Sequence, residues 1–332
     1  MDPAAMTRDV WRVDADAYPA GASVDEQIRF LLRYAVLAPS SHNSQPWEFV
    51  VGNGYVGVEA AEERRLSAAD PDGRELHLGL GCAVETLRIA AHRFGVGCVV
   101  HTFDEGPTVA RIDLGPACNP HRDGRLFDEI TERYTDHRPF DGPPVSEAVL
   151  DDLREHAASL DVALRSVDDA DARESVGDLQ RRADRLQADS PAYRRELAAW
   201  IGSGALGASG LRARVGRAVV THLDVGPVEG RRNAKLIADA PTLCVLSTAD
   251  DTRGERVNAG RAYQRIALAA SAEGLATHPL SQILERPAER RSLRSVLGID
   301  GRPQHLFRVG AVEGRQEHTP RWPADAVTST AR

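Results

Sequence analysis

The segment Ala38–Val51 reads APSSHNSQPWEFVV. Its first nine residues are rich in Ser, Asn and Pro, and an apolar, aromatic run follows them. This pattern is typical of a polar loop that enters a β-strand. The hydroxyl groups of Ser40 and Ser41 and the amide of Asn43 are hydrogen-bond donors and acceptors. Held in fixed positions, such groups can satisfy the carbonyl oxygens and ring nitrogens of a heterocyclic cofactor. The simpler alternative is an ordinary capped turn.

An internal repeat organises the rest of the chain. Gly81–Gly95 aligns with Gly260–Gly274, with Gly at the first and fifteenth positions, Ala at the third and an Ala-Ala pair in between. Small residues let a helix approach its neighbour closely, and the final Gly suits a left-handed cap. The repeat therefore predicts two buried central helices. Chance similarity between two Ala-rich helices is the alternative.

A shorter match supports the repeat. Val24–Arg33 aligns with Val145–Arg154, and both segments have the pattern of an amphipathic helix entered from a loop. Strand-like runs accompany each pair of helices; they are Trp47–Val51, Tyr55–Val58, Thr242–Ser247 and His305–Val312. The predicted fold class is therefore α+β, with two similar halves in one chain.

The repeat also predicts the domain boundaries. We expect an N-terminal tail over residues 1–22, a first half over 23–118 and a second half over 119–332. The second half contains an insertion at about 165–235, charged and helical at first and then Gly-rich. A long insertion of this kind is often a lid or an interface element. The alternative is a solvated helical excursion.

Composition narrows the class of protein. The chain has 332 residues and a net charge of −8, which disfavours a broad nucleic-acid surface. The sequence predicts neither a secretory signal nor a membrane span, because no basic segment followed by an apolar run opens it and no long uninterrupted apolar stretch occurs. Four scattered Cys and 11 His show no metal-binding spacing. We therefore expect a cytoplasmic protein without a metal site.

A second motif lies at Arg133–Phe140, RYTDHRPF, followed by PPVSE at Pro143–Glu147. Its Arg133 and Thr135 supply a guanidinium and a hydroxyl, both of which can donate hydrogen bonds. The alternative for this Arg/His cluster is a solvated loop.

Both motifs resemble signatures of the nitroreductase superfamily. The first is similar to APSxxNxQPWxFxV and the second to RRSxRxF followed by PVPxE. The resemblance implies that Ser40, Ser41 and Asn43 hold a flavin mononucleotide (FMN), and that Arg133 and Thr135 bind its phosphate. It also nominates Arg321 near the C-terminus as a phosphate ligand.

The resemblance has two departures near the flavin ring. His137 stands where the family commonly has Arg or Lys beside the pyrimidine, and the adjacent Arg138 is an alternative for that role. Thr277, Pro279 and Leu280 occupy the loop in which the family's backbone N–H groups approach flavin N5. The usual Pro-x-Glu-Gly is absent there. The catalytic role of that loop is therefore open.

Each half lacks the motif that the other keeps, so the chain resembles a nitroreductase homodimer fused into one polypeptide with one of two flavin sites lost. This arrangement is similar to the Acg-like branch and implies one FMN per chain. A further oligomer is compatible with that site but not required for it.

The leading hypothesis is an FMN-dependent oxidoreductase that takes hydride from NAD(P)H and reduces a small acceptor. The alternative is a protein that binds or sequesters FMN with little turnover. A third option is a Rossmann nucleotide site at Gly202–Gly207, GSGALG. That option is disfavoured because the run follows a helical pattern and no strand precedes it.

Overall fold

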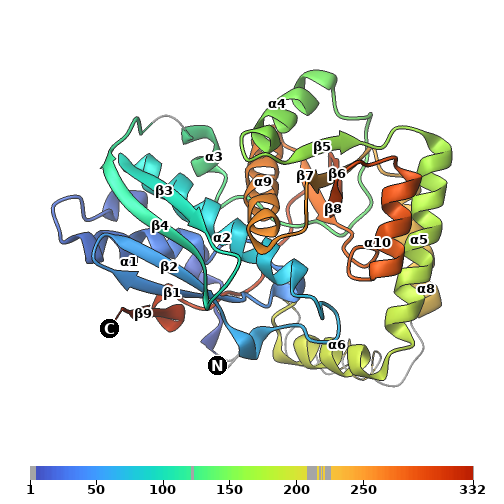
Figure 1. The fold of residues 1–332 in the computed structure, drawn as a ribbon, viewed down its shortest axis with the longest axis horizontal. Helices are drawn as coiled ribbons and strands as arrows, with labels where there is room; N and C mark the ends of the chain where they lie inside the picture. Colours follow the sequence, from blue (N-terminus) through green and yellow to red (C-terminus); the bar gives the residue numbers. More distant parts are fainter. Residues whose placement is uncertain are drawn as a thin grey trace.

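Two separate β-sheets stand on either side of a central pair of long helices, α2 (Arg74–Arg93) and α9 (Arg253–Ala272) (Figure 1). The computed structural model describes residues 5–120, 123–207, 215–216, 218, 220 and 226–331. Parts of the predicted insertion, including residues 208–214, lie outside the described residues. The architecture confirms the predicted α+β class.

The first sheet has the strand order β3-β4-β2-β1-β9. Its strands are β1 (Trp47–Gly52), β2 (Tyr55–Ala60), β3 (Val96–Thr102), β4 (Thr108–Ala117) and β9 (Thr328–Thr330). All neighbours are antiparallel except β9, which pairs parallel with β1. The end of the chain therefore returns to the sheet formed by its first third, as Figure 1 shows.

The second sheet has the order β5-β6-β8-β7 and is antiparallel throughout. Its strands are β5 (Ala163–Ser166), β6 (Thr242–Thr248), β7 (Ala276–Pro279) and β8 (Arg302–Gly310). The sequence predicted β1, β2, β6 and β8 within three residues at each end. The strands β3, β4, β5, β7 and β9 were missed.

The other α-helices with given bounds in the described residues are α1 (Val24–Ala35), α3 (Gly124–Asp128), α4 (Glu147–Ala158), α5 (Ala170–Ala188), α6 (Pro191–Ser203), α8 (Gly226–Ala238) and α10 (Pro287–Val296). Ser23 and Ser146 cap α1 and α4, each accepting a hydrogen bond from a backbone N–H of the first turn. Both matching segments therefore form helices, although α4 begins at Glu147, two residues after Val145, the counterpart of Val24.

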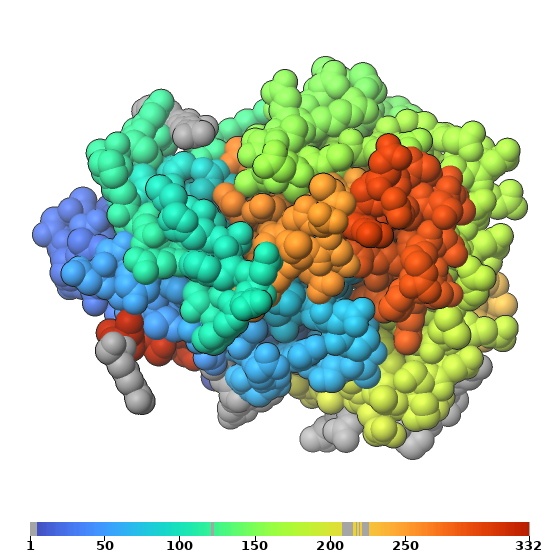
Figure 2. All heavy atoms as spheres, in the orientation of Figure 1, coloured from blue at the N-terminus to red at the C-terminus, as the bar shows by residue number. Residues whose placement is uncertain are grey.

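The two central helices touch backbone to backbone. A Cβ atom added at Gly260 would lie 2.0 Å from the Leu78 carbonyl oxygen, and one added at Gly81 would lie 2.1 Å from that of Val257. Only glycine permits such an approach. Gly95 and Gly274 follow the two helices with φ of 76° and 71°, which confirms the predicted left-handed caps. In the space-filling view, the cyan segment and the orange one lie in direct contact (Figure 2).

The predicted insertion is helical in its described part. Helices α5 and α8 pack against each other beside α10, whereas α6 reaches back to the first third of the chain. There, the two Glu196 carboxylate oxygens accept the backbone N–H groups of Ala68 and Ala69 at 3.0 and 2.9 Å. Helix α6 ends at Ser203, and Gly204 has a left-handed φ of 82°. The Gly-rich run Gly202–Gly207 therefore starts in the last turn of a helix and contains its C-cap, unlike the strand-to-helix turn of a Rossmann site.

No helix in the described part of the chain combines the length and apolar character needed to cross a membrane.

The crossing of α2 and α9 gives a direct test of the packing. Gly260→Ala should lower the free energy of unfolding by about 1–3 kcal/mol, because the added methyl group meets backbone that cannot rotate away. Gly177→Ala on α5 is the matched control, since its Cβ would meet its nearest neighbour at an ordinary 3.7 Å. The control should be neutral or stabilising by up to about 1 kcal/mol. Equal effects in urea unfolding would contradict the close crossing.

Candidate functional site

A cavity of about 740 Å³ lies beside the crossing of α2 and α9. Nine of the ten predicted site residues line it; they are Ser40, Ser41, Asn43, Arg133, Thr135, His137, Pro279, Leu280 and Arg321. The tenth, Thr277, is buried and its hydroxyl lies 3.1 Å from the hydroxyl of Tyr263, which lines the cavity. A smaller hollow of about 500 Å³ beside α1 contains none of the ten.

The loop after α1 is held in a strained conformation. His42, Asn43 and Gln45 have φ of 50°, 51° and 48°, in the left-handed region that non-glycine residues rarely adopt. The Ser40 hydroxyl accepts the Gln45 N–H at 2.9 Å, which closes the loop. The fold therefore holds the polar groups of this loop at the cavity wall.

Asn43 has a structural role that its sequence motif did not reveal. Its amide nitrogen donates to the carbonyl oxygens of Ala205 and Pro320 at 2.8 and 2.9 Å. This joins the loop to the end of the insertion and to the C-terminal segment. The side-chain carbonyl oxygen of Asn43 has no hydrogen-bond partner among the described residues.

Two buried arginines form the cationic end of the cavity. Arg133 and Arg321 are 3% and 4% exposed, and in the described part of the chain neither has a carboxylate partner. Their bonds are to neutral oxygens, such as Arg133 to the Leu37 carbonyl at 3.3 Å and Arg321 to that of Ala38 at 3.4 Å. Burial and the charge of Arg133 lower the pKa of Arg321 to about 9.

Further guanidinium nitrogens of this pair have no acceptor among the described residues; they are Nε and Nη1 of Arg133 and Nε of Arg321. Two like charges out of water are costly unless an anion compensates them. The geometry and charge of this end therefore suit a phosphate group.

The cavity is also lined by acidic and neutral polar groups that the sequence reasoning missed. Glu75, Tyr193, Glu285 and His305 line it. Burial, together with the charges of Glu75 and Asp70, raises the pKa of Glu285 to about 8. No local sequence pattern marks these residues, because α2, α6, β8 and the turn before α10 bring them together.

His305 is unusual within this group. Its ring is 1% exposed, and neither ring nitrogen has a hydrogen-bond partner among the described residues. Burial and the nearby charge of Arg74 lower its pKa to about 3. The imidazole is therefore neutral at the cavity wall, with one donor and one acceptor nitrogen.

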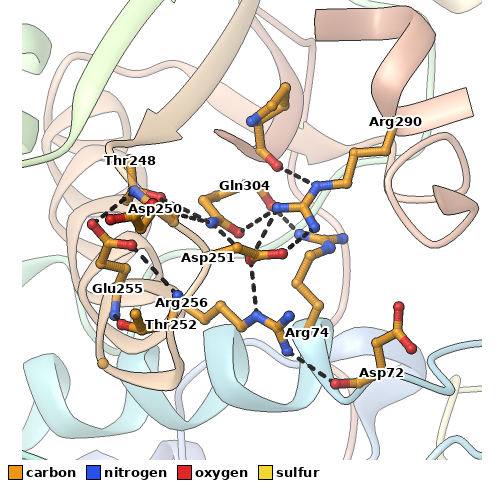
Figure 3. A network of polar contacts seen from close by, with 12 residues as sticks. Asp72, Arg74, Thr248, Asp250, Asp251, Thr252, Glu255, Arg256, Arg290 and Gln304 are labelled. Carbon is orange, nitrogen blue, oxygen red and sulfur yellow. Dashed lines mark hydrogen bonds and ion pairs between the residues drawn. The ribbon is translucent and has the colours of Figure 1, made fainter. Parts of the chain in front are cut away.

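A network of ion pairs and hydrogen bonds is connected to the cavity residue Glu75 (Figure 3). Asp251 accepts from Arg256 at 2.9 Å and from Arg290 at 2.7 Å, and it also accepts from the Gln304 amide at 3.1 Å. The backbone carbonyl of Gln304 accepts a hydrogen bond from Arg74, and Arg74 is ion-paired with the cavity residue Glu75. The network ties the starts of α2 and α9 to α10 and β8.

The loop after α9 differs from the expectation. Pro279 has no N–H, and the N–H of Leu280 donates to the Leu306 carbonyl at 2.8 Å. Neither residue can therefore direct a backbone N–H toward a ring. In the described structure the N–H groups of Ser281 and Gln282, which also line the cavity, have no acceptor.

The chain is thus an α+β protein with a cavity lined by two buried arginines and by polar side chains. Residues 130–311 match the sequence profile described as the Nitroreductase family. The chain is 31% identical to the "Putative NAD(P)H nitroreductase acg" of Mycobacterium tuberculosis over 90% of this chain and 94% of that protein. It is 32% identical to a second "Putative NAD(P)H nitroreductase" of that organism, covering 86% and 85%.

Among solved structures, the chain resembles an NADPH:FMN oxidoreductase from Vibrio harveyi, with 14% identity, 61% and 75% of the chains covered and a TM-score of 0.40. It also resembles an FMN-dependent nitroreductase from Mycobacterium smegmatis, with 17% identity, 57% and 89% covered and a TM-score of 0.37. On the profile and the relatives, the chain belongs to the nitroreductase family, and it is an oxidoreductase of the nitroreductase type.

The raised pKa of Glu285 predicts a pH-dependent stability. As the pH rises from about 4.5 to about 8, the unfolded chain loses this proton while the folded chain keeps it, so folding becomes less favourable. The slope is on the order of 1 kcal/mol per pH unit. Glu285→Gln cannot ionise, so its free energy of unfolding should rise relative to wild type across that range.

The control for this comparison is Glu155→Gln on the exposed face of α4. Groups common to all three proteins cancel in the difference, so this variant should follow the wild-type pH profile in urea unfolding. A constant difference between Glu285→Gln and wild type from pH 5 to 8 would show that Glu285 ionises normally.

Proposed function

We propose that the cavity binds one FMN per chain, with its phosphate at Arg133 and Arg321. The observation that carries this proposal is the pair of buried guanidiniums without a carboxylate partner among the described residues. Such a pair is stabilised when a dianionic group binds, and a phosphate ester supplies both the charge and the acceptor oxygens. The hydroxyl of Thr135, in the same cavity, is a further donor.

The remaining predicted residues suit the polar parts of the flavin. The Ser40 and Ser41 hydroxyls can donate to ring or ribityl oxygens, and the free carbonyl oxygen of Asn43 can accept an N–H. Bound FMN would supply two-electron chemistry, accepting hydride from NAD(P)H and passing electrons to a small acceptor. The protein's part is to orient both partners and to hold charged groups around them.

We further propose that residues 23–118 and 119–332 are duplicated halves and that only one flavin site persists. The positions on α9 that correspond to the cavity residues Gly79 and Cys82 are Asn258 and Arg261. Arg261 Nε lies 3.0 Å from the fully buried carboxylate of Glu85.

Further ion pairs surround that position. Arg88 and Arg265 contact the same carboxylate of Glu85 at 2.6 and 3.0 Å. In addition, only the short turn Ser159–Val162 separates α4 from β5, where the first half has its polar loop. Ion pairs in place of small side chains, and the missing loop, support a single site.

An FMN-sequestering role is the second candidate, favoured by the insertion. Tyr193 of α6 and Leu206 line the cavity, and Asn43 is bonded to Ala205 just beyond that helix. The insertion thus forms part of the wall, where it could restrict access by a nicotinamide. The family membership favours turnover.

The phosphate site predicts opposite effects of one substitution. Arg133→Met should weaken FMN binding about 10- to 150-fold, since a charge-assisted contact contributes about 1.5–3 kcal/mol. In the ligand-free protein the same change should raise the free energy of unfolding, because it removes an uncompensated buried charge beside Arg321. Flavin-fluorescence titration and urea unfolding measure the two effects.

The control is Arg125→Met, an arginine whose side chain is 54% exposed and paired with Glu273. It should change neither quantity appreciably. Wild-type protein should bind about one FMN per chain. Two per chain would refute the single-site proposal, and no binding after reconstitution would refute the FMN site itself.

Access of the electron donor separates the two functions. Anaerobic mixing of the FMN-loaded protein with NADH or NADPH should bleach the flavin absorbance at a rate that saturates with donor concentration. If dithionite reduces the flavin but neither nucleotide does, the sequestering role holds instead. In that case Glu196→Ala should speed reduction by nucleotides, because it releases α6 from Ala68 and Ala69.

A further inference from the structure

A hydrogen-bond chain of three side chains reaches the cavity from the second sheet. Nε of Arg308, on β8, donates to Nδ1 of His278, on β7, at 2.9 Å. Nε2 of His278 then lies 2.7 Å from Nδ1 of His137. His137 and His278 both line the cavity, whereas Arg308 is fully buried behind them.

The direction of this chain follows from valence. A guanidinium has donors and no acceptor, so Nδ1 of His278 must carry a lone pair. A neutral His278 then has its proton on Nε2, and it donates that proton to Nδ1 of His137. Because Nδ1 of His137 accepts this hydrogen bond, a neutral His137 carries its proton on Nε2. Nε2 is thus the ring nitrogen of His137 that the hydrogen-bond chain leaves for a ligand.

Arg308 is itself firmly placed. Its guanidinium stacks over the Phe140 ring at 3.8 Å and donates to the backbone carbonyls of Asp136 and Arg138. These contacts prevent the guanidinium from rotating away from His278. The start of the chain is therefore a permanent cation in a fixed orientation.

We propose that Arg308 and His278 are positioning residues that fix His137 as an Nε2–H donor, and that this neutral imidazole binds an acceptor atom of the cavity ligand. The ligand atom would be a carbonyl-type oxygen or an unprotonated ring nitrogen, and an N–H group would be rejected. With respect to the ligand, this inference rests on the proposed FMN site. The tautomer assignment stands independently of it.

The surroundings keep both rings neutral. The charged groups that face the pair are Arg308, Arg232 and the carboxylate of Asp136, which Arg138 holds at 2.7 Å. Burial and the two arginines lower the pKa of His137, and burial, His137 and both arginines lower that of His278 well below its usual value. Any added proton must also break one of the two hydrogen bonds, because both acceptor nitrogens of the chain are used.

The test is long-range ¹H–¹⁵N NMR of ¹⁵N-histidine-labelled protein without ligand, with the two rings assigned from His137→Gln and His278→Gln. At pH 7.5 both rings should show the Nε2–H form. They should remain neutral at pH 6, where a free imidazole of pKa about 6.5 is mostly protonated. Nδ1–H or mixed forms at either ring, or protonation at pH 6, would overturn the proposal.

Two variants separate positioning from a merely structural role. Arg308→Lys retains a donor to His278 and should keep the Nε2–H pattern, whereas Arg308→Met should give mixed tautomers at both histidines. Thermal unfolding checks that each variant is folded. Unchanged tautomers of His137 and His278 in a folded Arg308→Met variant would refute the positioning role of Arg308.

The ligand arm uses FMN itself. Its addition should shift the His137 Nε2–H proton downfield, and His137→Gln should weaken FMN binding about 2- to 10-fold. Bound FMN with no such shift would refute the donor role of His137. Absence of any FMN binding would refute the proposed function and leave the tautomer result as the test of the chain.

Discussion

The backbone contact between α2 and α9 is the constraint on which the rest of the structure depends. Because Gly81 and Gly260 allow the helices to touch, the two sheets are held at a fixed separation on either side. The cavity forms beside this crossing, with α2 supplying Leu78, Gly79 and Cys82 and α9 supplying Tyr263. A wider helix spacing would move all four residues away from the polar loops.

Charge is distributed unevenly around the cavity that results. The first group of wall residues is the pair of buried arginines, and the second is Glu75, Glu285 and His305. The first group favours a dianion, and the second contains side chains that stay neutral near pH 7, since the pKa of Glu285 is raised and that of His305 is lowered.

The insertion completes the site in space without supplying its charged groups. Its helices contribute Tyr193 to the wall, and the residues after α6 are bonded to the loop that follows α1. The C-terminal segment has a similar role, since it places Arg321 in the cavity and then adds β9 to the first sheet. Segments from the whole length of the chain thus meet at one cavity.

Local sequence predicted the two central helices with their left-handed caps, the two amphipathic helices and four of the described strands. The phosphate roles of Arg133 and Arg321 came from the family resemblance and stay a prediction. Helix caps and the polar loop depend on neighbouring residues, so their patterns can be read from the sequence, whereas the close contacts of Gly81 and Gly260 depend on the facing helix. Tertiary structure alone decided the hydrogen-bond chain from Arg308 to His137, the hydrogen bond from the Leu280 N–H to the Leu306 carbonyl and the pairing of Glu285 with Gln187. Tautomers, free N–H groups and shifted pKa values depend on which atoms face each other across 30 to 141 residues of sequence, a relation that no local pattern encodes.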